Sequence, residues 1–173
     1  MKLKIDDIIL ELLDDQHAGE LFKLTDANRS YLKEWLPWLD AINSENDTKR
    51  FIAISKQQHA DHNGFQLTIN RKGRIVGMIG LHYIDHEHQK TSIGYWIAQA
   101  YQKQGIVVRS CQALIDYCVQ ELALTTIEIS CATHNLKSQT IPKRLGFKKV
   151  KTVENAENLY GTMVDHHIFI FKK

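Results

Sequence analysis

The chain has 173 residues, 22 of them basic and 20 acidic, and this net charge of +2 does not indicate a nucleic-acid-binding surface. Hydrophobic residues make up 43% and charged residues 24%, the composition of an ordinary globular domain. No apolar run approaches the roughly eighteen residues of a membrane span, and the N-terminal segment lacks the apolar core of a signal peptide. We therefore expect one domain over residues 1–173, located in the cytoplasm, with neither membrane nor nucleic acid as a direct partner.

The first third of the chain predicts a strand followed by short helices. Residues 7–13 are typical of a strand, and Asp14 can cap the helical segment that follows. A second short helix is expected over residues 28–37, where a proline stops it. A third helix is expected over residues 47–62, with Asp47 as its N-cap. The residues on the apolar side of this helix are then Phe51, Ile52 and Ile54.

The middle third changes from helical periodicity to the period of two that strands show. Residues 65–70 and 74–84 predict a hairpin in which Gly73 supplies a positive φ, and residues 91–98 predict another strand. A long amphipathic helix is expected over residues 105–122. Its core face carries Val107, Cys111, Leu114, Cys118 and Leu122.

The last third predicts a strand over 126–132, a short helix over 138–147 that Gly146 ends, and two final strands over 148–153 and 165–171. No repeat, linker or low-complexity segment interrupts this order. Helices and strands alternate with a hairpin in the middle, which favours an α/β fold with a mixed sheet rather than a doubly wound one.

The junction before the long helix is a candidate anion site. A helix N-terminus leaves backbone N–H groups without partners and carries a partial positive charge, and glycine lets a ligand approach the backbone. Gly105 stands at this junction, and Lys103 adds a nearby cation. Neither G-x-x-x-x-G-K-[ST] nor G-x-G-x-x-G occurs in the chain. The alternative is that Gly105 only eases the chain into the helix.

The same junction resembles the Q/R-x-x-G-x-G/A pyrophosphate loop of the GNAT acetyltransferases, which bind acetyl-CoA. In the segment YQKQGIVVRS, Gln102 and Gly105 match this pattern. Val107 stands where the family usually has Gly or Ala, while Lys103 and Gln104 replace the commoner Gly-Lys. We therefore expect a loop with a bulkier and more cationic lining.

Further motifs resemble one branch of that family, the RimJ/RimL-type N-acetyltransferases that modify the N-terminal amine of ribosomal proteins. They are EWLPWLD, SIGYWIA, the pair Asn135 and Ser138, RLGFK and ENLYGTMVDHHIF, in that order along essentially the whole chain. The resemblance implies a GNAT fold, α/β with a mixed, mostly antiparallel sheet of about seven strands, a central splay between two parallel strands, and flanking helices. It also implies acetyl-CoA as the cosubstrate and no metal.

The resemblance assigns residues to the cosubstrate. Backbone amides at the helix start would hold the diphosphate, and the Ile97 amide would polarise the thioester carbonyl while the strand edge pairs with pantetheine, as an added strand does. Asn135 would hold the pantetheine arm or a water near the sulfur. The residues expected to bind the cosubstrate are thus Ile97, Gln102, Lys103, Gln104, Gly105, Ile106, Val107 and Asn135.

Acetyl transfer to an amine requires a base for the amine and a proton for the departing thiolate. The resemblance implies Glu157 as the base, with Glu154 as its neighbouring competitor, and Ser138 as the proton donor. The alternatives are purely structural roles. Glu157 would then be a surface glutamate in a polar loop, and Ser138 or Asn135 would cap a helix. The sequence contains no convincing nucleophile, so direct attack without an acyl-enzyme is expected.

The acceptor is the least determined part of the prediction. Trp35 and Trp38 lie three residues apart, so we expect them on nearby faces of a short helix, where they could line the acceptor pocket or belong to the core. A protein N-terminus is the leading acceptor, a small amine such as a polyamine or an aminoglycoside-like compound is an alternative, and a non-catalytic CoA-binding module is a third possibility. Family members of this kind are often dimers, but no surface stripe establishes a homodimer here.

The cysteines and histidines show no pattern that predicts a reactive thiol or a metal site. The three cysteines are an odd number, and buried free thiols are favoured over reactive ones. The histidine-rich segments at 82–88 and 165–167 contain no H-E-x-x-H and no Cys-His cluster, so no metal site is expected. Whether these histidines line the acceptor groove stays open at this point.

Overall fold

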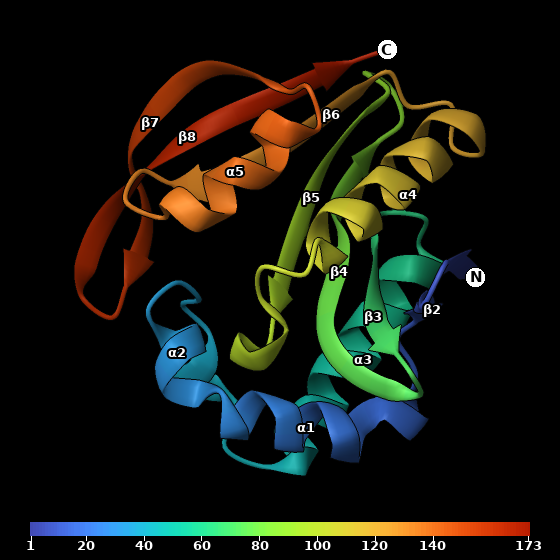
Figure 1. Cartoon of the computed structure of the whole chain (residues 1–173), viewed down its shortest axis with the longest axis vertical. Coiled ribbons are helices and arrows are strands. Elements are labelled where there is room, and N and C mark those ends of the chain that lie inside the picture. The colour runs from blue at the N-terminus through green and yellow to red at the C-terminus, as the bar shows by residue number, and fades with distance from the viewer.

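Eight extended segments form one mixed sheet in the computed structural model, which describes residues 1–173 (Figure 1). The strands are β1 (Lys2–Ile5), β2 (Ile8–Leu12), β3 (Phe65–Arg71), β4 (Arg74–Asp85), β5 (Lys90–Ile97), β6 (Thr126–Ala132), β7 (Lys148–Leu159) and β8 (Thr162–Lys172). Their order is β1-β2-β3-β4-β5-β6-β8-β7, and every neighbouring pair is antiparallel except β5 with β6. The mixed, mostly antiparallel sheet that the sequence predicts is confirmed.

The sheet has one strand more than the seven or so expected, because the first predicted strand pairs with a strand that precedes it. Asp6 adopts a φ of 49° and lets the chain reverse, so that β1 lies antiparallel to β2. Gly73 adopts a φ of 76° in the turn between β3 and β4, as the hairpin prediction requires. Tight turns with positive φ therefore set both of these pairings.

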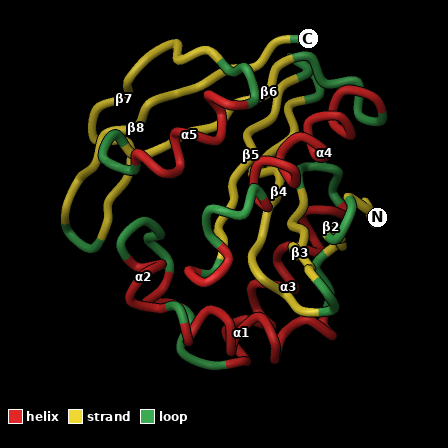
Figure 2. Tube along the Cα trace, viewed as in Figure 1, coloured by secondary structure: helices red, strands yellow, loops and turns green.

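Five α-helices flank the sheet (Figure 2), and three short 3-10 segments cover Asp15–His17, Leu39–Ala41 and Gln99–Tyr101, the first of which runs directly into an α-helix. The helices are α1 (Ala18–Ala27), α2 (Arg29–Lys33), α3 (Glu45–Ala60), α4 (Ile106–Gln120) and α5 (Leu136–Arg144). None of them is long and apolar enough to cross a lipid bilayer. The main apolar cluster lies under α4, and a smaller cluster lies between α1, α3 and the other face of the sheet.

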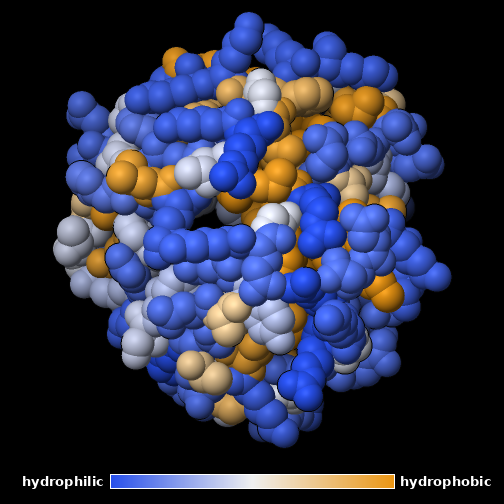
Figure 3. All heavy atoms as spheres, in the orientation of Figure 1, coloured by the Kyte–Doolittle hydropathy of each residue, from blue (hydrophilic) through white to orange (hydrophobic).

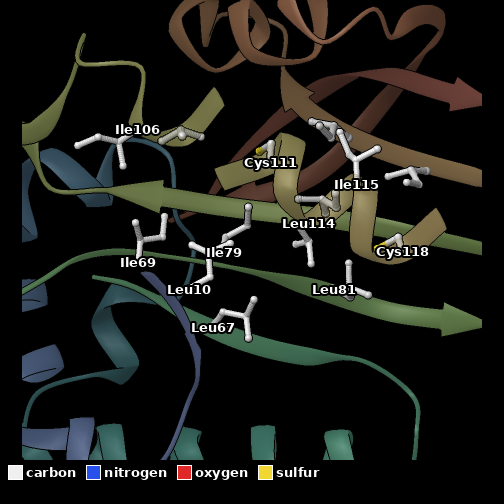
Figure 4. Packing of buried hydrophobic residues seen from close by; sticks show 14 of the residues in the cluster. Leu10, Leu67, Ile69, Ile79, Leu81, Ile106, Cys111, Leu114, Ile115 and Cys118 are labelled. Atoms are coloured by element: carbon white, nitrogen blue, oxygen red, sulfur yellow. The ribbon is translucent and has the colours of Figure 1, made fainter. Parts of the chain in front are cut away.

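The apolar face of α4 packs onto β2, β3 and β4, as the three- and four-residue spacing predicts (Figure 4). Its buried residues are Ile106, Val107, Ser110, Cys111, Leu114, Ile115 and Cys118. All three cysteines are free and buried, as expected. Burial raises the pKa of Cys118 to about 12, which keeps this thiol protonated and unreactive.

The predicted helices have different limits in the structure. α4 ends at Gln120, so Leu122 lies beyond it, and α5 covers Leu136–Arg144 and not 138–147. The second, α2, ends at Lys33, before the proline that was expected to stop it. The third, α3, begins earlier than predicted because Ser44 is its N-cap: the Ser44 hydroxyl accepts a hydrogen bond from the Asp47 N–H at 3.2 Å. The N-cap is therefore Ser44, three positions before the predicted Asp47.

One residue assigned to the core of α3 faces solvent. The buried positions of this helix are Thr48, Ile52 and Ser55, which recur at the helical spacing. Ile54 lies two residues from Ile52 and therefore on a different face, where it is 70% exposed.

The central splay is visible in the pairing of the two parallel strands. β5 and β6 are hydrogen-bonded only where residues 90–92 face residues 126–128, and the strands diverge beyond that point. The Ala98 N–H donates to the Val76 carbonyl of β4 at 2.9 Å. Backbone groups alternate sides along a strand, so the N–H of Ile97 points the other way, into the gap.

Candidate active site

A cavity of about 720 Å³ fills the gap between the diverging strands. In the space-filling view the surface is hollowed beside β5, between α5 and α2 (Figure 3). Nearly all of the residues expected at the site line this one cavity. They are Trp35, Ile97, Gln102, Lys103, Gln104, Gly105, Ile106, Val107, Asn135, Ser138 and Glu157.

Trp38 is the exception, and the structure separates it from Trp35. Trp38 lines a smaller adjoining pocket of about 340 Å³ and packs against Trp96 with ring centroids 6.4 Å apart. The two tryptophans do not share one helix, because α2 ends before both of them and Pro37 lies between them. The expectation that they lie on nearby faces of a short helix is therefore wrong.

The first turn of α4 presents free backbone donors to the cavity. Gly105 precedes the helix in the left-handed region at a φ of 69°, and no other part of the chain approaches the position that a Cβ atom would take. The N–H groups of Ile106, Val107 and Val108 have no hydrogen-bond acceptor in the protein. Several N–H groups in a row next to an open space are the arrangement that binds a phosphate group.

The side chains beside these amides hold the loop in place. The Gln104 side chain is hydrogen-bonded to Arg71, and its amide donates to the Ala100 carbonyl at 3.1 Å. The Gln102 amide donates to the Tyr31 hydroxyl, which joins this loop to α2. Gln102 and Gln104 thus line the cavity while their amide groups brace the loop.

A cationic rim surrounds the entrance. Lys103 from the loop, and Lys137 and Arg144 from α5, all line the cavity. Neither Lys137 nor Arg144 is predicted from the sequence as a site residue. The signal that could have found them is their spacing on α5, because two residues seven positions apart share one face of a helix.

Ser138 lies in the wall of the cavity in a small hydrogen-bonded group. Its hydroxyl donates to the Tyr95 hydroxyl at 3.2 Å and lies 3.3 Å from the Cys131 sulfur. The N-cap of α5 is Asn135, whose side-chain oxygen accepts from the Ser138 N–H at 3.0 Å. Of the two capping alternatives, the structure shows Asn135 as the cap and leaves the Ser138 hydroxyl free of that role.

The groups around Ser138 stay uncharged near neutral pH. Burial raises the pKa of Tyr95 well above its ordinary value and also raises the pKa of Cys131. A neutral phenol and a neutral thiol can each share hydrogen bonds with the serine hydroxyl. Tyr95 and Cys131 are site residues that the sequence did not reveal.

Glu157 reaches the cavity because a bulge redirects strand β7. In the pairing with β8, Val153 faces His166 while Glu157 faces Val164, so two extra residues are accommodated between them. The strand runs on to residue 159, so the expectation of a strand over 148–153 and a glutamate in a loop is corrected. Glu154, the competitor, is exposed and does not line the cavity.

Two histidines join Glu157 in the cavity. The Nε2 atom of His166 lies 3.4 Å from Oε2 of Glu157. His82 lies in the wall of the cavity and is exposed there, while the surrounding protein partly desolvates its ring and lowers its pKa, and the charge of Glu157 opposes that change. The side chain of His82 packs over Gly94, where a Cβ atom would lie 2.0 Å from its Nε2 atom.

The remaining histidines of the two segments point elsewhere. The Nε2 atom of His86 lies 2.8 Å from the His62 carbonyl, and the Nδ1 atom of His88 lies 2.8 Å from Asp85. No group of three or more His, Cys, Asp or Glu side chains is arranged to hold a metal ion. The sequence left a role in the acceptor groove open, and only His82 and His166 lie where such a role is possible.

The tip of the β7–β8 hairpin lies beside α2 (Figure 1). The Tyr160 hydroxyl donates to the Leu36 carbonyl at 2.6 Å and accepts from the Leu39 N–H at 3.0 Å. Lys33 lies 4.4 Å above the Tyr160 ring. These contacts tie the hairpin to the segment after α2, more than a hundred residues earlier in the chain.

Comparisons with known proteins agree with this geometry. A family model described as an acetyltransferase (GNAT) domain matches residues 7–148. The chain is 36% identical to a putative ribosomal N-acetyltransferase, YdaF, of Bacillus subtilis, over 95% of this chain and 89% of that protein. It is 27% identical to the ribosomal-protein-serine acetyltransferase of Escherichia coli, over 90% of this chain and 92% of that protein.

A solved structure shares the same architecture. The microcin C7 self immunity acetyltransferase MccE, crystallised with acetyl-CoA and AMP, superimposes with a TM-score of 0.93. The two are 27% identical, and the match covers 98% of this chain and 94% of that one.

Proposed function

The chain belongs to the GNAT family of acetyltransferases, and we propose that it acetylates the N-terminal α-amine of a ribosomal protein. It is an acetyl-CoA-dependent N-acetyltransferase. The main observation in favour of this acceptor is the single carboxylate of Glu157, which lines the same cavity as the free amides of α4. The names of the relatives from Bacillus subtilis and Escherichia coli support the same acceptor. Such a substrate would place the protein in the cytoplasm.

The cosubstrate fits the backbone-lined end of the cavity. The N–H groups of residues 106–108 hold its diphosphate, and the space beside Gly105 leaves room for it. The rim of Lys103, Lys137 and Arg144 complements its remaining phosphate. The open edge of β5 pairs with the pantetheine arm, and the N–H of Ile97 donates to the thioester oxygen.

The side chains at the other end then perform the transfer. Glu157 takes a proton from the acceptor ammonium, the free amine attacks the thioester carbonyl directly, and Ser138 gives a proton to the departing sulfur. An α-amine has a pKa near 8, about one unit from neutral pH, whereas a lysine side chain is more than three units away. One carboxylate is therefore a sufficient base for an N-terminal amine.

The second candidate acceptor is a small molecule with one amine. The similarity to an acetyltransferase named for self immunity against microcin C7 supports it. A polyamine fits less well, because Glu157 is the one carboxylate among the residues that line the cavity. A polycation requires several acidic partners.

The test is a screen of the purified protein with acetyl-CoA against three classes of acceptor. These are synthetic N-terminal peptides of ribosomal proteins, the same peptides with a blocked α-amine, and small amines that include polyamines. We expect thiol release with the free peptides and none with the blocked ones. Activity with small amines alone would replace the proposed acceptor. Binding of acetyl-CoA without thiol release from any amine would mean a non-catalytic CoA-binding module.

A further inference from the structure

A chain of three polar side chains runs from the surface to the proposed base. The Ser130 hydroxyl lies 2.8 Å from Nδ1 of His166, and Nε2 of His166 lies 3.4 Å from Oε2 of Glu157. Ser130 comes from β6, His166 from β8 and Glu157 from β7, three adjacent strands of the sheet. All three residues line the cavity.

The Nε2 atom of His166 has one group with which it can pair, the carboxylate of Glu157. The His166 side chain is 15% exposed, and its Nε2 atom is shielded from solvent without a hydrogen bond of ordinary geometry. A buried polar atom without a partner is costly, so it is expected to pair with the nearest group that complements it. Glu157 lies at ion-pair distance, and hydrogen bonds of this kind are often long in a free enzyme and shorten when substrate is bound.

We propose that His166 is a positioning residue for the base, with Ser130 fixing its tautomer. The Ser130 hydroxyl donates to Nδ1, which leaves the ring proton on Nε2, where it is directed at Oε2 of Glu157. The carboxylate is then held by one oxygen, and its other oxygen is free for the acceptor. This role rests on the proposed function, because it requires Glu157 to be the base.

The proton balance follows from this arrangement. The acceptor ammonium loses one proton to the free oxygen of Glu157, and its nitrogen lone pair forms the new bond to the acetyl carbon. The bond from that carbon to sulfur breaks, and the sulfur receives the proton that Ser138 donates. The nitrogen loses a second proton as the amide forms, which restores the Ser138 hydroxyl, and Glu157 releases its proton to solvent. His166 keeps its proton on Nε2 throughout and stabilises the charged form of the carboxylate before each turnover.

Other charged groups near Glu157 come from two directions. His82 of β4 faces it across the cavity, and its pKa is lowered by burial. In the bulge of β7, Glu154 is exposed, and Asp165 of β8 accepts a hydrogen bond from the Asn155 N–H at 2.9 Å. Of these groups, only His166 lies within ion-pair distance of the Glu157 carboxylate.

The experiment compares His166→Ala, His166→Gln and Ser130→Ala with the wild type on the best peptide from the screen. Glutamine can place an amide N–H close to the position of Nε2, whereas alanine removes the donor. We expect His166→Ala to lower kcat by about 10- to 100-fold with the KM for acetyl-CoA unchanged, as is usual when the partner of a catalytic group is lost. We expect His166→Gln to recover most of the loss and Ser130→Ala to lose less than tenfold.

A pH profile separates positioning from a structural role. Loss of a donor to the ionised carboxylate makes that form harder to reach, so the acidic limb of kcat/KM should move to higher pH in His166→Ala and return in His166→Gln. The matched control is His167→Ala, because the neighbouring ring bonds to Thr152 and lies outside the cavity. An unshifted limb in His166→Ala, or equal activities of the alanine and glutamine variants, would overturn the proposal. A wild type that acetylates no α-amine would instead refute the proposed function.

Discussion

Backbone groups line one end of the cavity, and side chains line the other. The end assigned to the cosubstrate consists mainly of backbone from Ile97 and residues 101–108, a segment that includes Gly105. The end assigned to the acceptor consists of side chains from five separate elements. They are Trp35 after α2, His82 on β4, Trp96 on β5, Glu157 on β7 and His166 on β8.

This difference determines how each end should respond to mutation. Backbone donors survive most changes of side chain, but they depend on the conformation of one or two residues. Side-chain groups can each be lost by a single substitution, and their positions depend on contacts between distant parts of the chain, such as that of Tyr160 with Leu36. The predictions below probe this contrast, beginning with the acceptor end.

The largest effect is expected from Glu157→Gln, which removes the proposed base while preserving the shape of the side chain. General-base catalysis contributes about 10²- to 10⁴-fold, so we expect kcat with an N-terminal peptide to fall by at least about 100-fold. The affinity for acetyl-CoA, measured by calorimetry, should not change. Glu154→Gln is the control, because this side chain is exposed and outside the cavity. Equal losses of kcat in the two variants would contradict the role of Glu157 as the base, and weaker binding of acetyl-CoA by Glu157→Gln would show that the ends are not independent.

At the cosubstrate end, Gly105→Ala should weaken binding of acetyl-CoA by roughly tenfold or more, because the new methyl group enters the space beside the free amides. Alanine at a positive φ also costs about 1–2 kcal/mol of stability. Gly73→Ala is a matched control, since Gly73 has a φ of 76°, is equally uncrowded, and lies away from the cavity. Calorimetry and urea unfolding should therefore show similar losses of stability in the two variants. Only Gly105→Ala should lose affinity.

The free amides at the start of α4 could be predicted from local sequence signals, whereas their assignment to acetyl-CoA came from the family resemblance. Gly105 and the amphipathic pattern of the following helix are local signals, and they place free amides at a helix start without knowledge of the rest of the fold. The strands and their mixed pairing also follow from local periodicity. Only the family resemblance indicated the splay between β5 and β6, because no periodicity reports how far two strands stay paired.

The acceptor end was predicted only in part. Glu157 was singled out from the family resemblance, but the bulge that turns it inward depends on two residues inserted opposite β8. Neither hydrophobic alternation nor turn residues mark such an insertion. His166 and His82 were noticed as histidines, yet 84 positions separate them in the chain, so only the tertiary fold could bring them to the same carboxylate.

A smaller effect is expected from the cationic rim. Exposed charge pairs contribute about 0.2–1 kcal/mol, so Arg144→Ala or Lys137→Ala should each raise the KM for acetyl-CoA by about two- to fivefold. The increase should shrink as salt is added, because the ions screen the attraction. Lys151→Ala, an exposed position outside the cavity, serves as the control. An increase that salt does not alter would mean that these side chains act through packing and not through charge.

The smallest effect concerns the acid stability of the acceptor end. Burial lowers the pKa of His82 in the folded protein, so the unfolded chain takes up a proton below roughly pH 6.5 that the folded chain does not. Stability is therefore lost as pH falls from that value toward the folded pKa. His82→Gln should lose less stability between pH 7 and pH 5 in urea unfolding, whereas His86→Gln, at an exposed position outside the cavity, should behave like the wild type. If His82→Gln lost as much stability as the wild type, the surrounding protein would not desolvate the His82 ring. The turn at the start of α4 carries no histidine, so the cosubstrate end contributes no pH dependence of this kind.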